Sequence, residues 1–148
     1  EAVQAFLDYK DKGIIVMCRN SNPGAGEFQD LEINGQKLYL KVADNIAKNW
    51  NINKNCLLVV GATVPEELAE IRQLVGDDMD FLVPGVGAQG GDVEASVKAG
   101  QNSSGAGLII NSSRAIIYAD NSENFAEVAR QKATETRDEI NKYRGGIQ

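Results

Sequence analysis

Residues 81–100 read FLVPGVGAQGGDVEASVKAG, and this stretch decides the fold class. Its apolar beginning belongs to a short strand that is expected to run from Asp80 to Gly85, and a glycine-rich loop follows it. Beyond the loop, Asp92 is the expected N-cap of a helix over 93–100, with Gly100 as its C-terminal stop. A strand, a loop and a helix in this order predict one βα unit.

Three more βα units have the same order along the chain. Short runs rich in Ile, Val and Leu predict strands over residues 13–18, 56–62 and 107–112. Amphipathic stretches predict helices over 38–50, over 63–76 and from Asp120 to Ile140; Thr63 with Glu66, and Asp120 with Glu123, have the spacing of a capping box. The first strand is apolar on both alternating faces, which is typical of a parallel sheet covered on both sides. The chain is therefore expected to be one α/β domain over residues 1–148.

The composition excludes several classes of function. The chain carries 15 basic and 21 acidic residues, a formal net charge of −6, and no Lys/Arg block, so nucleic acid is not an expected partner. No apolar run approaches the ~20 residues of a membrane span, and no signal-peptide layout is present, so a cytoplasmic location without membrane contact is expected. The sequence has no histidine, which excludes imidazole bases and His-ligated zinc. Cys18 and Cys56 lie in apolar runs, where two buried thiols are expected rather than a disulfide or a metal pair.

Gly85, Gly87 and Gly90 have the G-x-G-x-x-G spacing of dinucleotide-binding loops. Such a site also needs an acidic residue about 20 positions further on, whereas here the next strand ends in NSSR, residues 111–114. Arg114 in that place would suit the extra phosphate of NADP, so an NADP-dependent reductase is one interpretation. It is the weaker one, because only one strand and one helix follow the glycines, too few to complete a doubly wound sheet.

The same two loops fit a (β/α)8 barrel better. In such barrels the loops after strands 7 and 8, with a helix N-terminus, commonly hold a substrate phosphate. Backbone N–H groups of Gly87, Gly90 and Gly91, together with the hydroxyls and guanidinium of 111–114, would form such a site, although ordinary turn glycines and a surface arginine are the plainer interpretation. Because a complete barrel has eight βα units in about 250 residues, four units predict the C-terminal half of a barrel, with strands 5 to 8.

Four loop segments in this order resemble the C-terminal half of the orotidine 5′-phosphate decarboxylases of the longer bacterial type. The segments are CRNSNPGAGEFQDL (18–31), VVGATVPEEL (59–68), FLVPGVGAQGGDVEASVKAG (81–100) and INSSRAIIYA (110–119). The resemblance extends over essentially the whole chain. It implies the conversion of orotidine 5′-monophosphate to uridine 5′-monophosphate in pyrimidine biosynthesis, with neither a metal nor an organic cofactor.

The resemblance implies a phosphate site at the last two loops. Arg114 and the backbone N–H of Ser113 would hold the phosphate, and Gln89 would bridge toward both the phosphate and the base. A plainer role is also open for Gln89, which could satisfy a loop carbonyl.

The resemblance also implies contacts to the pyrimidine. Ser21 would hydrogen-bond the base, while Pro84 and Val86 would line the pocket beside it. Ser21 could instead cap a turn, and Pro84 could simply end its strand.

The catalytic groups that the resemblance implies are missing from this chain. They are a lysine and an Asp-x-Lys-x-x-Asp array on early barrel strands, where a lysine protonates the carbanion at C6. Asp8 and Lys10 offer only Asp-x-Lys, because Gly13 occupies the position of the further carboxylate. They also precede a strand, which would place them on the face opposite the site, so a solvated helix end is expected there. The acid–base chemistry is therefore expected from the absent half of the barrel.

The partners expected from these observations are the nucleotide, the missing N-terminal half and a second copy in a homodimer. The alternative is a non-catalytic fragment that binds a nucleotide or phosphate, and open sheet edges should then make it associate with itself or another chain. Another phosphate-binding barrel enzyme, such as an aldolase or an epimerase, is a further alternative.

Overall fold

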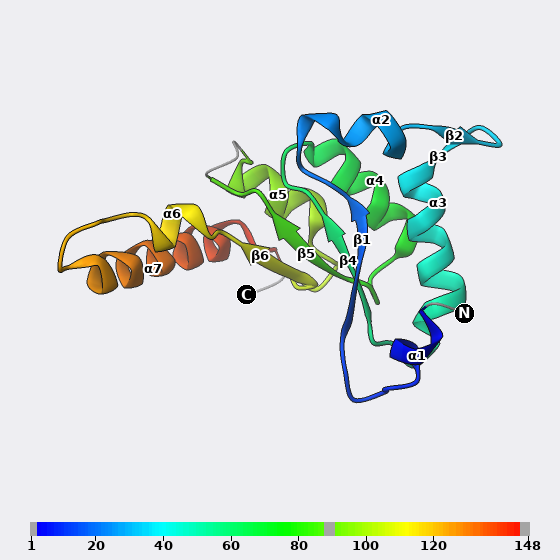
Figure 1. Cartoon of the computed structure of the whole chain (residues 1–148), viewed down its shortest axis with the longest axis horizontal. Helices are drawn as coiled ribbons and strands as arrows, with labels where there is room; N and C mark the ends of the chain where they lie inside the picture. The colour runs from blue at the N-terminus through cyan, green and yellow to red at the C-terminus, as the bar shows by residue number, and fades with distance from the viewer. Residues whose placement is uncertain (1–2, 88–90, 146–148) are drawn as a thin grey trace.

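The computed structural model describes residues 3–87 and 91–145, and its centre is a four-stranded parallel sheet (Figure 1). The strands are β1 (Ile14–Arg19), β4 (Cys56–Val60), β5 (Asp80–Pro84) and β6 (Leu108–Asn111), which pair in the order β1-β4-β5-β6. Each strand of the sheet therefore pairs with the next one along the chain, as in a barrel. A doubly wound sheet would reverse its strand order at a switch point, so this topology argues against the reductase interpretation.

Helices cover one face of this sheet (Figure 1). They are α3 (Leu38–Asn45), α4 (Pro65–Val75) and α5 (Val93–Gly100), which follow β1, β4 and β5, and α3 continues into η2 (Ile46–Trp50) and η3 (Asn51–Asn53). After β6 come α6 (Arg114–Ile117) and α7 (Phe125–Tyr143), and α1 (Gln4–Leu7) precedes β1. Between β1 and α3 lie η1 (Pro23–Ala25), α2 (Gly26–Gln29) and an antiparallel hairpin of β2 (Glu32–Ile33) and β3 (Gln36–Lys37). The four predicted βα units are confirmed, while the hairpin, α2 and α6 were not predicted.

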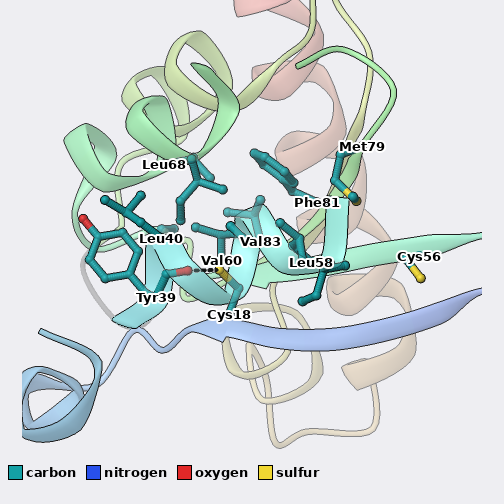
Figure 2. Close-up of a cluster of buried hydrophobic side chains, with 14 of the residues drawn as sticks. Cys18, Tyr39, Leu40, Cys56, Leu58, Val60, Leu68, Met79, Phe81 and Val83 are labelled. Atoms are coloured by element: carbon teal, nitrogen blue, oxygen red, sulfur yellow. Dashed lines mark hydrogen bonds between the residues drawn. The ribbon is translucent and has the colours of Figure 1, made fainter. Parts of the chain in front are cut away.

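The core lies between the sheet and these helices (Figure 2). Alternate residues of the central strands face the helices and are fully buried, as period-2 strand geometry requires; they are Leu58, Val60, Phe81 and Val83. Tyr39 packs among them from α3, and its backbone carbonyl accepts a hydrogen bond from the Cys18 thiol at 3.3 Å. Cys18 and Cys56 are both free and buried, as predicted.

The other face of the sheet is apolar and uncovered within the described residues. It carries the alternate residues Ile15, Met17, Leu57, Val59, Leu82 and Ile109, which we call the open face. Ile15 and Met17 are each 50% exposed and Ile109 is 49% exposed. The expectation that the first strand is covered on both sides is therefore wrong for this chain alone. A physical reason is that this face of a barrel strand points into the barrel, whose interior is filled by side chains from all the strands.

Two of the predicted helix starts differ from the structure. Asp92 caps α5 as predicted, accepting from the Ala95 N–H at 2.7 Å, and Gly76 ends α4 with a φ of 75°. The capping box at Thr63 is wrong, because α4 begins at Pro65 and the Thr63 hydroxyl donates to the Ser21 carbonyl instead. The capping box at Asp120 is wrong too: α7 begins at Phe125, and the Asp120 carboxylate accepts from the backbone N–H and hydroxyl of Ser122.

Helix α7 is poorly buried. It packs against α5 and α6, yet none of its 19 residues is buried, and Phe125 is 58% exposed. In Figure 1 it extends outward beyond β6, with α6 beside it. Its predicted apolar stripe therefore lacks a full partner within the described residues. No helix in the described part of the chain is long and apolar enough to cross a membrane.

Candidate functional site

Those predicted site residues that the structure describes lie at one edge of the sheet, where all four parallel strands have their carboxyl ends. Ser21 follows β1, Pro84 ends β5, and Ser113 and Arg114 follow β6. Backbone hydrogen bonds extend the sheet just past the strand ends, from the Gly61 N–H to the Arg19 carbonyl and from the Ala62 N–H to the Pro84 carbonyl, both at 2.9 Å. Ligands of parallel α/β folds bind at this edge.

A small cavity lies between the ends of β5 and β6. It measures about 80 Å³ and is lined by Pro84, Gly85, Val86, Asn111, Ser112, Ser113 and Arg114. The structure therefore brings together two loops that the sequence places 26 residues apart at Val86 and Ser112, whose hydroxyl lies 3.4 Å from the Val86 carbonyl. Asn111 and Ser112 also line the cavity, and both belong to the NSSR loop that the sequence predicts at a phosphate site.

Arg114 is exposed at the mouth of this cavity. Among residues 3–87 and 91–145, no carboxylate pairs with its guanidinium. The neighbouring Ser113 hydroxyl accepts a hydrogen bond from the Asn111 amide at 3.3 Å. A cation without a counter-charge beside hydroxyls and amides can bind a phosphate through charge-assisted hydrogen bonds.

The glycine loop contributes shape more than free donors. The Gly87 N–H donates to the Gly91 carbonyl at 3.0 Å, and the Gly91 N–H donates to the Gly85 carbonyl at 3.1 Å. A Cβ on Gly91 would lie 2.7 Å from the Ala62 Cβ, so only glycine fits where the loop packs on the end of β4. The described amides of Gly87 and Gly91 are thus already used inside the loop. Gln89 and Gly90, two further predicted residues, lie outside the described residues.

Val86 was predicted to line the pocket, but its side chain is mostly in the core. Its side chain is 3% exposed and packs in the hydrophobic core, although the residue also borders the β5–β6 cavity. Val86 therefore anchors the glycine loop to the core, while the half-buried Pro84 lies closer to the surface of the cavity.

A larger cavity lies beside Ser21, between the loop after β1 and the start of α4. It measures about 570 Å³ and is lined by Arg19, Asn20, Ser21, Asn22, Pro23, Ala25, Gly26, Asp30, Thr63, Val64 and Glu67. The Ser21 carbonyl accepts from the Thr63 hydroxyl at 3.1 Å. The structure thus places Ser21 at the same edge as Arg114 but in a separate cavity.

Sequence reasoning missed a charged cluster at this larger cavity. Arg19 is 7% exposed, and its guanidinium bonds both carboxylate oxygens of Glu67, at 2.7 and 2.6 Å. These hydrogen bonds are the main reason that the pKa of Arg19 is raised. The available signal was a charged residue directly after a buried apolar strand, since an arginine in that position is buried only with partners.

Asp8 and Lys10 are far from this edge, as predicted. Helix α1 ends at Leu7, and residues 8–12 are exposed and precede the amino end of β1 (Figure 1). They therefore belong to the opposite end of the sheet from Ser21 and Arg114.

Both the sequence and the fold of this chain match known proteins. Residues 1–129 match the family described as Orotidine 5'-phosphate decarboxylase / HUMPS. The orotidine 5'-phosphate decarboxylase of Azoarcus sp. (strain BH72) is 56% identical over 97% of this chain and 53% of its own length, and that of Janthinobacterium sp. (strain Marseille) is 54% identical over 97% and 52%. Among solved structures, Leishmania donovani UMP synthase superposes with a TM-score of 0.83 at 40% identity, over 96% of this chain and 30% of that one. Leishmania donovani OMP decarboxylase gives 0.78 at 35%, over 93% and 52%.

A four-stranded half of a (β/α)8 barrel, with a cavity of about 80 Å³ at the carboxyl ends of its strands, defines the class of this protein. The chain belongs to the orotidine 5′-phosphate decarboxylase / HUMPS family. It spans about half the length of the curated relatives that it matches.

Proposed function

We propose that this chain supplies the phosphate- and pyrimidine-binding loops of an enzyme that decarboxylates orotidine 5′-monophosphate to uridine 5′-monophosphate. The observation that carries the proposal is the convergence of the glycine loop and the NSSR loop on one cavity, with Arg114 at its mouth and no ion pair to it among the described carboxylates. Over the matched residues, two relatives named orotidine 5′-phosphate decarboxylase are 56% and 54% identical to this chain, which supports the same substrate.

In this proposal the phosphate binds between the ends of β5 and β6. Arg114 provides the charge and the Ser113 N–H a neutral donor, with Gln89 reaching from the glycine loop. The Gly87 and Gly91 amides are engaged within their loop, so among the described residues Arg114 is the principal charged donor to the phosphate in this proposal. Phosphate binding energy of this kind can also lower the barrier at the distant base.

The base lies toward β1 in the same proposal. Ser21 hydrogen-bonds the pyrimidine, and Pro84 lines the space between base and phosphate. The bond between C6 and the carboxylate breaks, carbon dioxide leaves, and the carbanion at C6 takes a proton from a lysine that the other half of the barrel provides. This chain thus binds and orients the nucleotide.

The missing half is the first partner that we propose. The open face is an apolar surface that the interior of a closed barrel would cover, and the poorly buried helix α7 would gain a neighbour among the outer helices. The relatives are long enough to contain such a half, because the match covers only 53% of the Azoarcus protein. Here this chain is the C-terminal half, the complete barrel forms a homodimer, and the location is cytoplasmic.

The test uses the complete barrel, meaning this chain joined to the half that it lacks, for example that of the Azoarcus relative. We expect turnover of orotidine 5′-monophosphate, followed by its ultraviolet absorbance. Arg114→Ala should raise KM and lower kcat/KM by about 10- to 100-fold, as expected for the loss of a charged hydrogen bond of about 1.5 to 3 kcal/mol. Arg137→Ala, an exposed arginine on α7, is the matched control and should leave both constants unchanged.

Two outcomes contradict parts of this proposal. A folded complete barrel without turnover would leave the non-catalytic nucleotide-binding fragment as the better function, and calorimetric binding of uridine 5′-monophosphate to the 148-residue chain would support that alternative. Unchanged kinetics in Arg114→Ala would refute only the phosphate role of Arg114 and would leave the rest of the proposal standing.

A further inference from the structure

The buried guanidinium of Arg19 links the two ends of the segment that carries Ser21. Arg19 lies directly before this segment and Asp30 lies at its far end, and Nη1 of Arg19 is 3.1 Å from Oδ1 of Asp30. A second tie lies alongside, because the Asn20 N–H donates to Oε1 of Gln29 at 3.0 Å. Residues 20–29 therefore form a loop whose two ends are held together.

A bulge in β1 turns Arg19 toward the helices. The pairing register with β4 shifts between Met17 and Arg19, and Cys18 and Arg19 are both buried, although neighbouring strand residues normally point to opposite faces. Regular alternation would have placed Arg19 on the open face with Ile15 and Met17. Bulges that re-aim a side chain are frequent beside active sites.

The re-aimed guanidinium is fixed to two helices. It makes the two-point contact with Glu67 on α4, whose side chain is 15% exposed, and it lies 4.9 Å from the centre of the Tyr39 ring on α3. The Tyr39 hydroxyl in turn donates to Glu70 on α4 at 2.6 Å. A forked, nearly buried pair of this kind is rigid in direction, so it fixes the end of β1 relative to α4.

Ser21 packs directly against the residues between β4 and α4. A Cβ on Gly61 would lie 2.7 Å from the Ser21 Cα, so the two backbones are in close contact, and the Thr63 hydroxyl bonds the Ser21 carbonyl. A shift of the segment against α4 therefore moves Ser21.

We propose that Arg19 is a positioning residue, which sets the place of Ser21 against the nucleotide base by holding segment 20–29 to α4. The inference rests on the proposed function, because the base contact of Ser21 is part of that function. In this role Arg19 acts through the segment: its Nε and Nη2 donate to Glu67, and its Nη1 forms an ion pair with Asp30.

The experiment compares Arg19→Met, Ser21→Ala and the double variant in the complete barrel. A displacement of about 1 Å at a positioning contact can cost on the order of 100-fold in rate, so Arg19→Met should lower kcat/KM by at least about tenfold. If Arg19 acts through Ser21, the double variant should be no slower than the more damaged single variant, because the two losses are the same loss. Arg19→Lys, which keeps the charge but not the fork, should recover part of the activity.

Arg130→Met is the matched control. Arg130 makes the same two-point contact with Glu127, at 3.0 and 2.6 Å, but on the exposed face of α7, and its loss should leave kcat/KM unchanged. Circular dichroism checks that each variant is folded. If Arg19→Met does not fold, the same double comparison is made with Arg19→Lys.

The outcomes separate this inference from the proposed function. A wild-type barrel that does not turn over orotidine 5′-monophosphate refutes the proposed function and the inference with it. An active wild type in which Arg19→Met has normal kinetics, or in which the Arg19 and Ser21 effects multiply independently, overturns the positioning role and leaves the function standing.

Discussion

Replacing Arg72 tests whether one buried side chain holds together the amino-terminal end of the sheet. Arg72 lies on α4 and is 8% exposed, and its guanidinium is 3.9 Å from the centre of the Phe81 ring. All its acceptors are backbone carbonyls: Gly76 at 2.8 Å, Met79 at 2.6 Å, Gly100 at 2.8 Å and Gly107 at 3.2 Å. Burial is the main cause that lowers the pKa of Arg72, and no carboxylate forms a salt bridge with it among the described residues.

The magnitude follows from which carbonyls would lose their donor. Gly107 keeps the Phe81 N–H as a second donor at 3.0 Å. The carbonyls of Gly76 and Gly100 lie at or beyond helix ends, where no intrahelical donor reaches, and Met79 precedes β5. Methionine in place of Arg72 would fill similar space but donate nothing. Three lost bonds at about 1 to 1.5 kcal/mol each give about 3 to 5 kcal/mol of lost stability.

The assay is thermal and urea unfolding of the complete barrel. At about 2 to 4 °C for each kcal/mol in a domain of this size, Arg72→Met should lower the Tm by about 10 °C, and Arg72→Lys should lower it less because it retains a donor. Arg130→Met removes an exposed arginine with the same fork geometry and should change the Tm by no more than about 2 °C. A loss in Arg72→Met as small as in this control would refute the reasoning that the carbonyls depend on Arg72.

Three other predictions concern the glycine loop, a thiol and the open face. Gly91→Ala puts a Cβ against Ala62, so it should cost about 1 to 3 kcal/mol and lower kcat/KM in the complete barrel; normal values would show that the loop can shift. Burial raises the pKa of Cys18 to about 12, so a thiol reagent at neutral pH should label Cys18 only after denaturation. The pKa of the thiol in the unfolded chain is 9.0, so the stability that the buried, neutral thiol contributes should be complete below that pH and be lost as the pH rises toward 12. Unfolding curves recorded across that pH range measure this loss. Labelling of Cys18 in the folded protein as fast as that of an exposed thiol would contradict its burial. The 148-residue chain alone should self-associate in sedimentation experiments, less so with Met17→Thr, whereas a monodisperse monomer at high concentration would show that the open face tolerates water.

Local sequence signals predicted most of the elements. Short runs rich in Ile, Val and Leu located all four sheet strands to within two residues, and Asp92 and Gly76 marked helix ends because a cap depends only on its immediate neighbours. The same local logic failed at Thr63. Its spacing to Glu66 suits a capping box, but the hydroxyl bonds the Ser21 carbonyl, 42 residues away in the sequence.

The site was predicted in part for the same reason. Loops after successive parallel strands must meet at one edge, so the meeting of Pro84 with Ser113 and Arg114 could be foreseen. The Arg19–Glu67 pair could not, because a regular strand would point Arg19 to the open face and only the bulge reverses it. The engaged amides of Gly87 and Gly91 likewise depend on the exact path of the loop.

The sequence by itself determined the βα order, the half-barrel, the two buried thiols and the edge of the sheet at which the candidate site lies. These follow from hydrophobic periodicity and from strand direction, which are properties of short segments and of their order. The tertiary structure alone decided which charges are buried together, which glycine amides are free and which apolar face is left uncovered. Those depend on contacts between residues far apart in the chain, and a one-residue change of register is enough to reverse the side on which an arginine lies.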